Sequence, residues 1–137
     1  MRLELTREGD YAVRAMLALA SRGANEIVSS RLIAAEWGIP HRFLTHVLAR
    51  LAESGLVEAV TGRRGGYKLA RPLSEIRLID IVEAIDGSAS ATRCVLRGGP
   101  CGPDGRCRVH DTFALARQRY TDTLASRTLA DISGSPG

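Results

Sequence analysis

Thiol groups are concentrated in one short stretch of this chain. The only cysteines are Cys94, Cys101 and Cys107, and His110 follows the last of them by three residues. Three thiolates and one imidazole form a complete donor set for a metal ion or an iron-sulfur core. An odd number of cysteines excludes a closed set of internal disulfides, and clustered thiols in a reducing compartment indicate metal or redox chemistry. We therefore predict that this stretch binds an inorganic group.

Residues 88–108, which contain the cysteines, are predicted to form a loop because they show no apolar periodicity. Glycine and proline between the thiols allow the backbone to wrap around an inorganic core. Nearby arginines would offset the negative charge of such a core. These arginines are Arg93, Arg97, Arg106 and Arg108.

Other chemistries are compatible with the same residues. Three thiolates and His110 would also complete a structural zinc site, although the paired two-residue spacings typical of zinc fingers are absent. A disulfide between two of the thiols would make a redox switch, and an unliganded loop is a further alternative. An enzyme using Cys107 and His110 has least support, because a nucleophile needs one activated thiol in a cleft. We therefore favour an iron-sulfur cluster at these residues, and a structural zinc site is the alternative.

The elements ahead of the cysteines follow the order of a helix-turn-helix. Apolar residues recur at helical spacing in three segments that, counted with their capping residues, span 6–23, 29–37 and 41–55. Ser29 or Ser30 is expected to cap the second helix. The short break between the second and third helices contains Gly38 and a proline, as in a tight turn between two DNA-binding helices.

A hairpin is predicted directly after the third helix. Leu56–Val60 and Tyr67–Ala70 have strand character, and the turn 61–66 between them is rich in glycine. A hairpin in this place is typical of the wing of a winged helix-turn-helix. A fourth helix is expected over Ile76–Ile85, with Gly87 as its stop.

A long amphipathic helix is expected after the cysteine loop. Its apolar stripe predicts a homodimer, because one small winged unit alone would bury too little of it. The stripe consists of Val109, Phe113, Ala116, Tyr120 and Leu124. The expected fold is mainly α with a small β wing, divided into a winged helix-turn-helix over 1–87, a cysteine-rich loop over 88–108, and a dimerisation helix with a frayed tail over 109–137.

Basic residues gather where a winged helix would meet DNA. Lys68 is the only lysine among 19 basic residues in a chain of net charge +4, and arginine suits phosphates and base edges. A bias of the genome towards arginine codons, or a merely solvated helix and hairpin, would also explain the pattern. We predict that the third helix enters the major groove and that the wing approaches the minor groove. The candidate DNA-binding residues are Arg31, His41, Arg42, Thr45, His46, Arg50, Arg63 and Arg64.

Composition limits the remaining classes of protein. With 137 residues and 45% apolar residues, the chain is expected to form one compact unit. It contains no apolar run near the roughly 20 residues of a membrane span, and its N-terminus lacks the apolar stretch of a secretory signal. We therefore expect a cytoplasmic protein without a membrane partner.

The sequence resembles the iron-sulfur winged-helix regulator family typified by IscR and NsrR, and the likeness covers almost the whole chain. It is carried by the cysteines together with six short segments. These are Met1-Arg2-Leu3, Tyr11-Ala12-Val13, 51–57, Gly65-Gly66-Tyr67, Ala91-Thr92-Arg93-Cys94 and Thr128-Leu129-Ala130-Asp131. The resemblance implies a homodimer crossed through the C-terminal helix, with two wings on a pseudo-palindromic operator. It also implies a transcriptional repressor whose operator affinity is controlled by an iron-sulfur cluster.

Two versions of the cluster site occur in that family, and they differ in the fourth ligand. Some members resemble this chain in having a histidine at the place of His110, and they hold a two-iron, two-sulfur cluster. Others take a carboxylate from the partner's first helix, at the place of Asp10, and hold a four-iron, four-sulfur cluster. An acid in a first helical turn also interacts favourably with the helix dipole, by about 0.3–1 kcal/mol. The expectation is therefore His110 with a two-iron cluster, and Asp10 with a four-iron cluster is the alternative.

Overall fold

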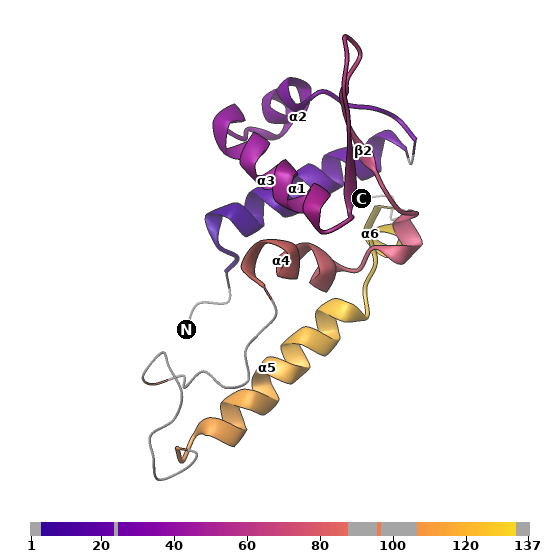
Figure 1. Cartoon of the computed structure of the whole chain (residues 1–137). Coiled ribbons are helices and arrows are strands. Elements are labelled where there is room, and N and C mark those ends of the chain that lie inside the picture. Colours follow the sequence, from indigo (N-terminus) through magenta and orange to yellow (C-terminus); the bar gives the residue numbers. More distant parts are fainter. Residues whose placement is uncertain (1–3, 24, 88–95, 97–106, 134–137) are drawn as a thin grey trace.

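The computed structural model describes residues 4–23, 25–87, 96 and 107–133, and it confirms a mainly helical fold with a small antiparallel hairpin (Figure 1). Four helices and the hairpin form the N-terminal part, and two helices follow the cysteine segment. The elements are α1 (Arg7–Arg22), α2 (Ser30–Trp37), α3 (His41–Glu53), β1 (Val57–Val60), β2 (Gly66–Leu69), the 3-10 helix η1 (Leu73–Glu75), α4 (Leu78–Asp86), α5 (His110–Ala125) and α6 (Leu129–Ser133).

Side-chain caps begin the first two helices, as the sequence predicts. The Thr6 hydroxyl accepts a hydrogen bond from the Gly9 N–H at 3.1 Å. Ser29 rather than Ser30 caps α2, because its hydroxyl accepts from the Leu32 N–H at 3.2 Å. Gly38 then ends α2 in the left-handed conformation, with a φ of 65°. Such local signals set the start and direction of the helix-turn-helix.

The core lies where α1, α3 and α4 pack together. Alanines on the inner face of α1 allow the other two helices to approach closely, and larger aliphatic side chains of α3 fill the space between them. Helical spacing places Phe43 next to the buried face of α3, but this residue is only half-buried. The completely buried side chains of α1 and α3 are Ala12, Ala15, Met16, Leu44, Val47, Leu48 and Leu51.

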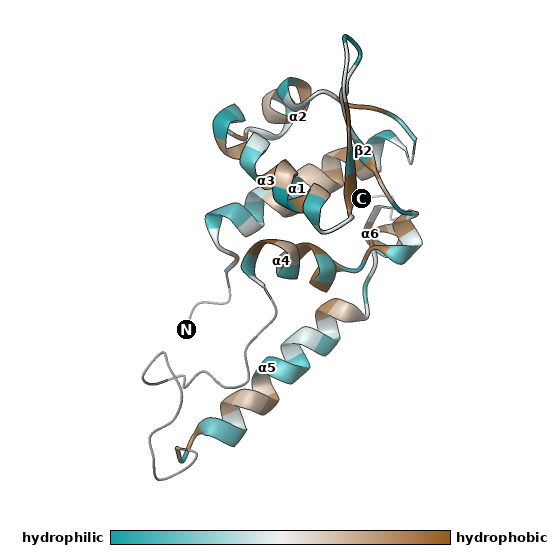
Figure 2. Ribbon diagram, viewed as in Figure 1, coloured by the Kyte–Doolittle hydropathy of each residue, from teal (hydrophilic) through white to brown (hydrophobic). Residues whose placement is uncertain are grey.

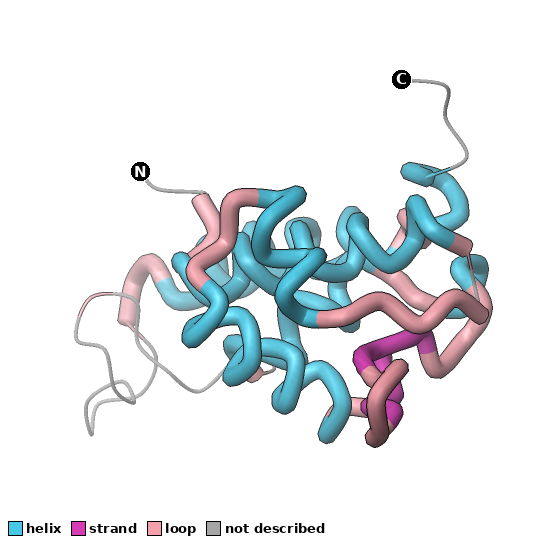
Figure 3. The backbone as a smooth tube through the Cα atoms, turned by 90° about the horizontal axis from the view of Figure 1, so that it is seen from above, coloured by secondary structure: helices cyan, strands magenta, loops and turns pink. Residues whose placement is uncertain are grey.

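Val28, which lies just before α2, holds the wing against the helices by pairing with β2. The two strands of the wing pair in antiparallel register, with Val57 opposite Leu69 and Val60 opposite Gly66. Val28, just before α2, exchanges two backbone hydrogen bonds of 2.8 Å with Tyr67. A Cβ atom on Gly66 would lie 2.4 Å from the Val28 carbonyl oxygen, so this close approach requires glycine. Figure 3 shows the hairpin at one side of the helical cluster.

The C-terminal segment returns to the core, which the sequence analysis did not foresee. The predicted start of α4 at Ile76 is two residues early, because Ile76 instead pairs with the chain after α5. Its carbonyl accepts from the Leu129 N–H at 2.8 Å, and the Leu78 N–H donates to the Arg127 carbonyl at 2.9 Å. Leu129 is fully buried and begins α6, which packs on α1 and η1. Of the predicted tail 133–137, only Ser133 is described, and it ends α6.

Helix α5 contacts α4 but extends beyond the rest of the molecule (Figure 1). Within α5, all of which the structure describes, no residue is buried. Phe113, Leu115 and Tyr120 are 39%, 54% and 39% exposed, respectively. These apolar side chains are therefore accessible on the surface of α5. No described helix has both the length and the apolar character needed to cross a bilayer.

Candidate nucleic-acid interface and cysteine segment

Helix α3 and the wing turn carry most of the predicted DNA-binding residues. Arg42 and His46 are exposed on α3, and Arg63 and Arg64 are exposed in the turn of the hairpin. Arg31 is exposed on the neighbouring α2. The turn of the wing is hydrophilic in Figure 2. The structure therefore presents these side chains to solvent on the elements that the sequence predicts for DNA contact.

Arg42 is held in place by an aromatic pair. Its guanidinium carbon lies 4.6 Å from the centre of the Phe43 ring, and that ring stacks on Tyr11 of α1 with 6.3 Å between centroids. A cation over an aromatic face gains about 0.5–1 kcal/mol at an exposed site. This contact restricts the long side chain of Arg42 at the N-terminal end of α3. The sequence analysis missed the pair because Tyr11 and Phe43 are far apart along the chain.

Two other polar residues of α3 already have partners within the protein. His41 Nε2 lies 2.9 Å from the Ser30 hydroxyl oxygen, which joins the start of α3 to the start of α2. The Thr45 hydroxyl donates to the Arg42 carbonyl at 3.1 Å. His41 and Thr45 are both half-buried. Their contribution to DNA recognition stays a prediction.

Arg50 does not face outward as the sequence analysis expected. Its Nη1 donates to Glu8 Oε2 of α1 at 3.1 Å, and its Nη2 donates to the carbonyl oxygen of Ile85 in α4. The side chain is 35% exposed. Helical spacing places Arg50 on the polar side of α3, but the packing of α4 covers that side near the C-terminal end of α3.

The wing base contains an internal ion pair. Lys68 of β2 and Glu58 of β1 lie directly opposite each other in the ladder, and Lys68 Nζ is 3.7 Å from Glu58 Oε2. This pair compensates the only lysine of the chain. The uncompensated charge of the wing is therefore attributed to the arginines of its turn.

Half of the predicted cluster ligands lie at the start of α5. Cys94 and Cys101 lie outside the described residues. Cys107 and His110 are half-buried, and the His110 N–H donates to the Cys107 carbonyl at 3.1 Å. The backbone hydrogen bond thus places Cys107, just before α5, and His110, the first residue of α5, in one turn of the chain. In residues 107–133 and the other described ranges, no three His, Cys, Asp or Glu side chains form a metal site.

Asp10, the alternative fourth ligand, is engaged within its own helix. Its two carboxylate oxygens accept hydrogen bonds from Nε and Nη2 of Arg14, at 2.8 and 3.1 Å. Arg14 also reaches the Trp37 carbonyl oxygen at 3.4 Å. Ligation by Asp10 would require this two-point ion pair to open. Its role as a ligand stays a prediction.

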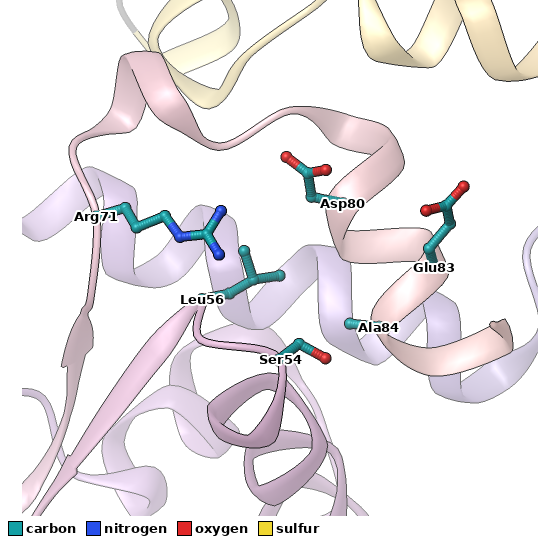
Figure 4. A pocket seen from close by; sticks show the side chains of 6 residues that line it. All are labelled: Ser54, Leu56, Arg71, Asp80, Glu83 and Ala84. Atoms are coloured by element: carbon teal, nitrogen blue, oxygen red, sulfur yellow. The ribbon is translucent and has the colours of Figure 1, made fainter. Parts of the chain in front are cut away.

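An open pocket of about 230 Å³ lies between the wing base and α4 (Figure 4). Arg71 extends into it towards Asp80. Partial burial raises the pKa of Asp80, but the hydrogen bonds and charge of Arg77, with the charge of Arg71, outweigh burial and hold this pKa below its usual value. The charge of Asp80 is therefore compensated by arginines of the protein itself. The lining residues are Ser54, Leu56, Arg71, Asp80, Glu83 and Ala84.

Comparison with known families decides the class of this protein. A model of the Rrf2 family, described as iron-dependent transcriptional regulators, matches residues 5–135. The chain belongs to the Rrf2 family. This assignment confirms the predicted class of transcriptional regulator and excludes the enzyme alternative, because the relatives are regulators as well.

Individual relatives align in sequence with nearly the whole chain of this Rrf2 regulator. It is 37% identical over 130 residues to IscR of Photorhabdus laumondii, covering 95% of this chain and 79% of the relative. It is 35% identical over 130 residues to IscR of Escherichia coli O1:K1, covering 95% and 80%. Both relatives are described as HTH-type transcriptional regulators.

Solved structures confirm the fold of this Rrf2 regulator. The structure of IscR from T. potens matches with a TM-score of 0.76 at 28% identity, covering 95% of this chain and 85% of that one. CymR, described as the global cysteine regulator of B. subtilis, matches with a TM-score of 0.79 at 22% identity, covering 97% and 98%. The CymR likeness concerns the fold alone. Together they confirm the predicted winged helix-turn-helix.

Proposed function

We propose that this Rrf2 regulator is a homodimeric repressor whose operator affinity is set by an iron-sulfur cluster bound by Cys94, Cys101, Cys107 and His110. The observation that carries the proposal is the shared turn of Cys107 and His110 at the start of α5. The likeness to IscR over 95% of the chain supports the same assignment. When bound, a cluster would supply a redox- and iron-responsive group held by the cysteine segment and the start of α5.

DNA contact is assigned to the exposed side of α3 and to the wing. Arg42, with Thr45 and His46 in the next turn, is suited to the major groove, where arginine reads guanine through two hydrogen bonds. Arg63 and Arg64 at the wing turn are suited to the minor groove. The flanking His41 and Arg31 are assigned to supporting contacts. Arg50 is left out of this set because it already binds α1 and α4.

A second copy of the chain is assigned to the exposed face of α5. Two recognition helices must lie about one helical turn of DNA apart to read a two-fold operator. Phe113 and Tyr120 are one heptad apart on the same side of α5, and each is 39% exposed. A two-fold contact along this side would cover both side chains and place the two cysteine segments near the dimer centre.

The two cluster types differ in their fourth ligand, which is an imidazole in one case and a carboxylate in the other. Neutral imidazole can bind iron through one ring nitrogen while the other donates a hydrogen bond. We assign this part to His110 and favour a two-iron, two-sulfur cluster. A four-iron, four-sulfur cluster with Asp10 is the alternative, and it requires Arg14 to release the Asp10 carboxylate.

Anaerobic purification followed by absorption spectroscopy and iron, sulfide and zinc analysis tests the cofactor. Coloured protein with matching iron and sulfide supports the proposal. Colourless protein with one zinc ion per chain contradicts it and supports a structural zinc site.

Alanine variants of the ligands refine the test. Each of Cys94→Ala, Cys101→Ala and Cys107→Ala should abolish the cluster, and His110→Ala should leave a labile or altered one. His46→Ala is a matched histidine control that should keep the cluster but weaken operator binding. Loss of the cluster in Asp10→Ala, with no effect of His110→Ala, would assign the fourth ligand to Asp10 instead.

A further inference from the structure

Three helices that are distant in the sequence meet around Arg50. This residue lies in the last turn of α3, where its Nη1 donates to Glu8 Oε2 at 3.1 Å and its Nη2 donates to the Ile85 carbonyl. Beside it, the Thr6 hydroxyl donates to Asp86 Oδ1 at 3.2 Å. We call Thr6, Glu8, Arg50, Ile85 and Asp86 the Arg50 junction.

The two contacts at the centre of the junction suit the planar guanidinium of an arginine. Carbonyl groups in the last turn of a helix have no partner within the helix, and Ile85 is in the last turn of α4. The planar guanidinium of Arg50 donates to this carbonyl and to the Glu8 carboxylate at the same time, which a lysine ammonium does with less defined geometry. Arg50 therefore links the end of α4 directly to α3.

The position of the junction along the chain connects two functional regions. Only Gly87 separates Asp86 from residues 88–108. This segment contains all three cysteines of the chain. Figure 1 shows the end of α4 beside the start of α1, where the chain leaves for that segment. At its other end, α3 carries Arg42, about 12 Å along the helix from Arg50 at 1.5 Å per residue.

Helix α3 is suited to transmit a displacement over this distance. Its buried face is closely packed, with Leu44, Val47, Leu48 and Leu51 fully buried, so it moves as a rigid element rather than bending. A shift of Ile85 would be passed to Arg50 through the hydrogen bond between them. The shift then changes the angle at which Arg42 and His46 meet DNA.

We propose that the Arg50 junction couples the state of the cysteine segment to the placement of α3, with Arg50 as a positioning residue. The inference rests on the proposed function, because it takes the cysteine segment as the site whose state changes. It assigns Arg50 a role within the protein in place of the direct DNA contact that the sequence predicts for it.

The test compares operator affinity of apo and cluster-loaded protein, measured anaerobically by fluorescence anisotropy at several salt concentrations. In the wild type, a ratio between the two states of about 5- to 150-fold is typical of allosteric coupling. Arg50→Gln should bring this ratio close to 1 while cluster content stays at the wild-type level. Its salt dependence should keep the wild-type slope, whereas loss of a phosphate contact would lower the slope by about 0.9.

Two further variants sharpen the result. Glu8→Gln changes an exposed side chain and keeps the contact of Arg50 with Ile85. It should therefore lower the affinity ratio by about 2- to 5-fold, as expected for one ion pair. If Arg50→Gln does not fold, the ratio in Glu8→Gln tests the coupling role by itself. Arg22→Gln is the matched control, because the Arg22–Glu36 pair joins α1 to α2 and leaves α4 untouched. It should keep the wild-type ratio.

Amide hydrogen exchange gives a readout that does not depend on DNA. Exchange in residues 83–87 should be faster in Arg50→Gln than in the wild type, and unchanged in Arg22→Gln. An unchanged affinity ratio in both Arg50→Gln and Glu8→Gln overturns the coupling role, as does an equal loss of affinity in both states with a shallower salt slope. Wild-type protein that lacks a cluster, or binds operator equally in both states, overturns the proposed function, and the coupling role falls with it.

Discussion

Replacing Leu129 with alanine tests whether the C-terminal segment is part of the core. Leu129 is fully buried at the start of α6, and its N–H donates to the Ile76 carbonyl at 2.8 Å. The substitution removes three carbon atoms but keeps this backbone hydrogen bond. Transfer of about 0.8 kcal/mol per buried methylene amounts to about 2.4 kcal/mol. With the cavity left behind, the expected loss is about 2–5 kcal/mol of unfolding free energy.

The same deletion at Leu32 is the matched control. Leu32 lies on α2 and is 38% exposed, and alanine is a better helix former than leucine. Leu32→Ala should therefore cost about 1 kcal/mol or less. The difference between the two variants isolates the effect of burial.

Urea unfolding followed by circular dichroism measures both losses. The cluster-free proteins should be compared at one protein concentration, because the stability of the proposed dimer would depend on concentration. A Leu129→Ala variant that loses no more than Leu32→Ala would refute the reasoning and show that α6 does not stabilise the fold.

Three other predictions concern DNA binding, assembly and acid stability. Arg64→Ala should weaken operator binding and lower the salt slope by about 0.9 without loss of fold; equal affinity at every salt concentration would contradict this role. Phe113→Glu should give a monomeric mass by light scattering, because it places a charge on the exposed side of α5, and a persistent dimer would exclude that side as the interface. Partial burial raises the pKa of Asp80, yet the hydrogen bonds and charge of Arg77 hold this pKa below its usual value. The ionised Asp80 carboxylate therefore stabilises the fold above about pH 4, and this stabilisation is lost as the pH falls through the lowered pKa. Asp80→Asn should therefore flatten the acid limb of unfolding free energy against pH, and an unchanged limb would disprove the contribution.

Much of the architecture could be predicted from the sequence because it depends on local signals. The caps at Thr6 and Ser29, the stop at Gly38 and the glycines of the wing turn each act on residues within a few positions. Helical spacing similarly identified the buried face of α3. The exposure of Arg42 on α3 follows from the same helical periodicity, and that of Arg63 and Arg64 follows from the predicted turn of the wing. The short α6 was missed, although Thr128 followed by Asp131 has the spacing of a capping box.

The contacts that join the elements were decided only by the tertiary structure. Arg50 reaches Glu8 and the Ile85 carbonyl across separations of 42 and 35 residues, and the Tyr11–Phe43 stack spans a similar gap. Periodicity places a residue on one side of a helix, but it carries no information about which distant element covers that side. For that reason the sequence alone identified the basic residues and the candidate cluster ligands, and the packing of α1 and α4 against α3 decided that Arg50 binds the protein itself.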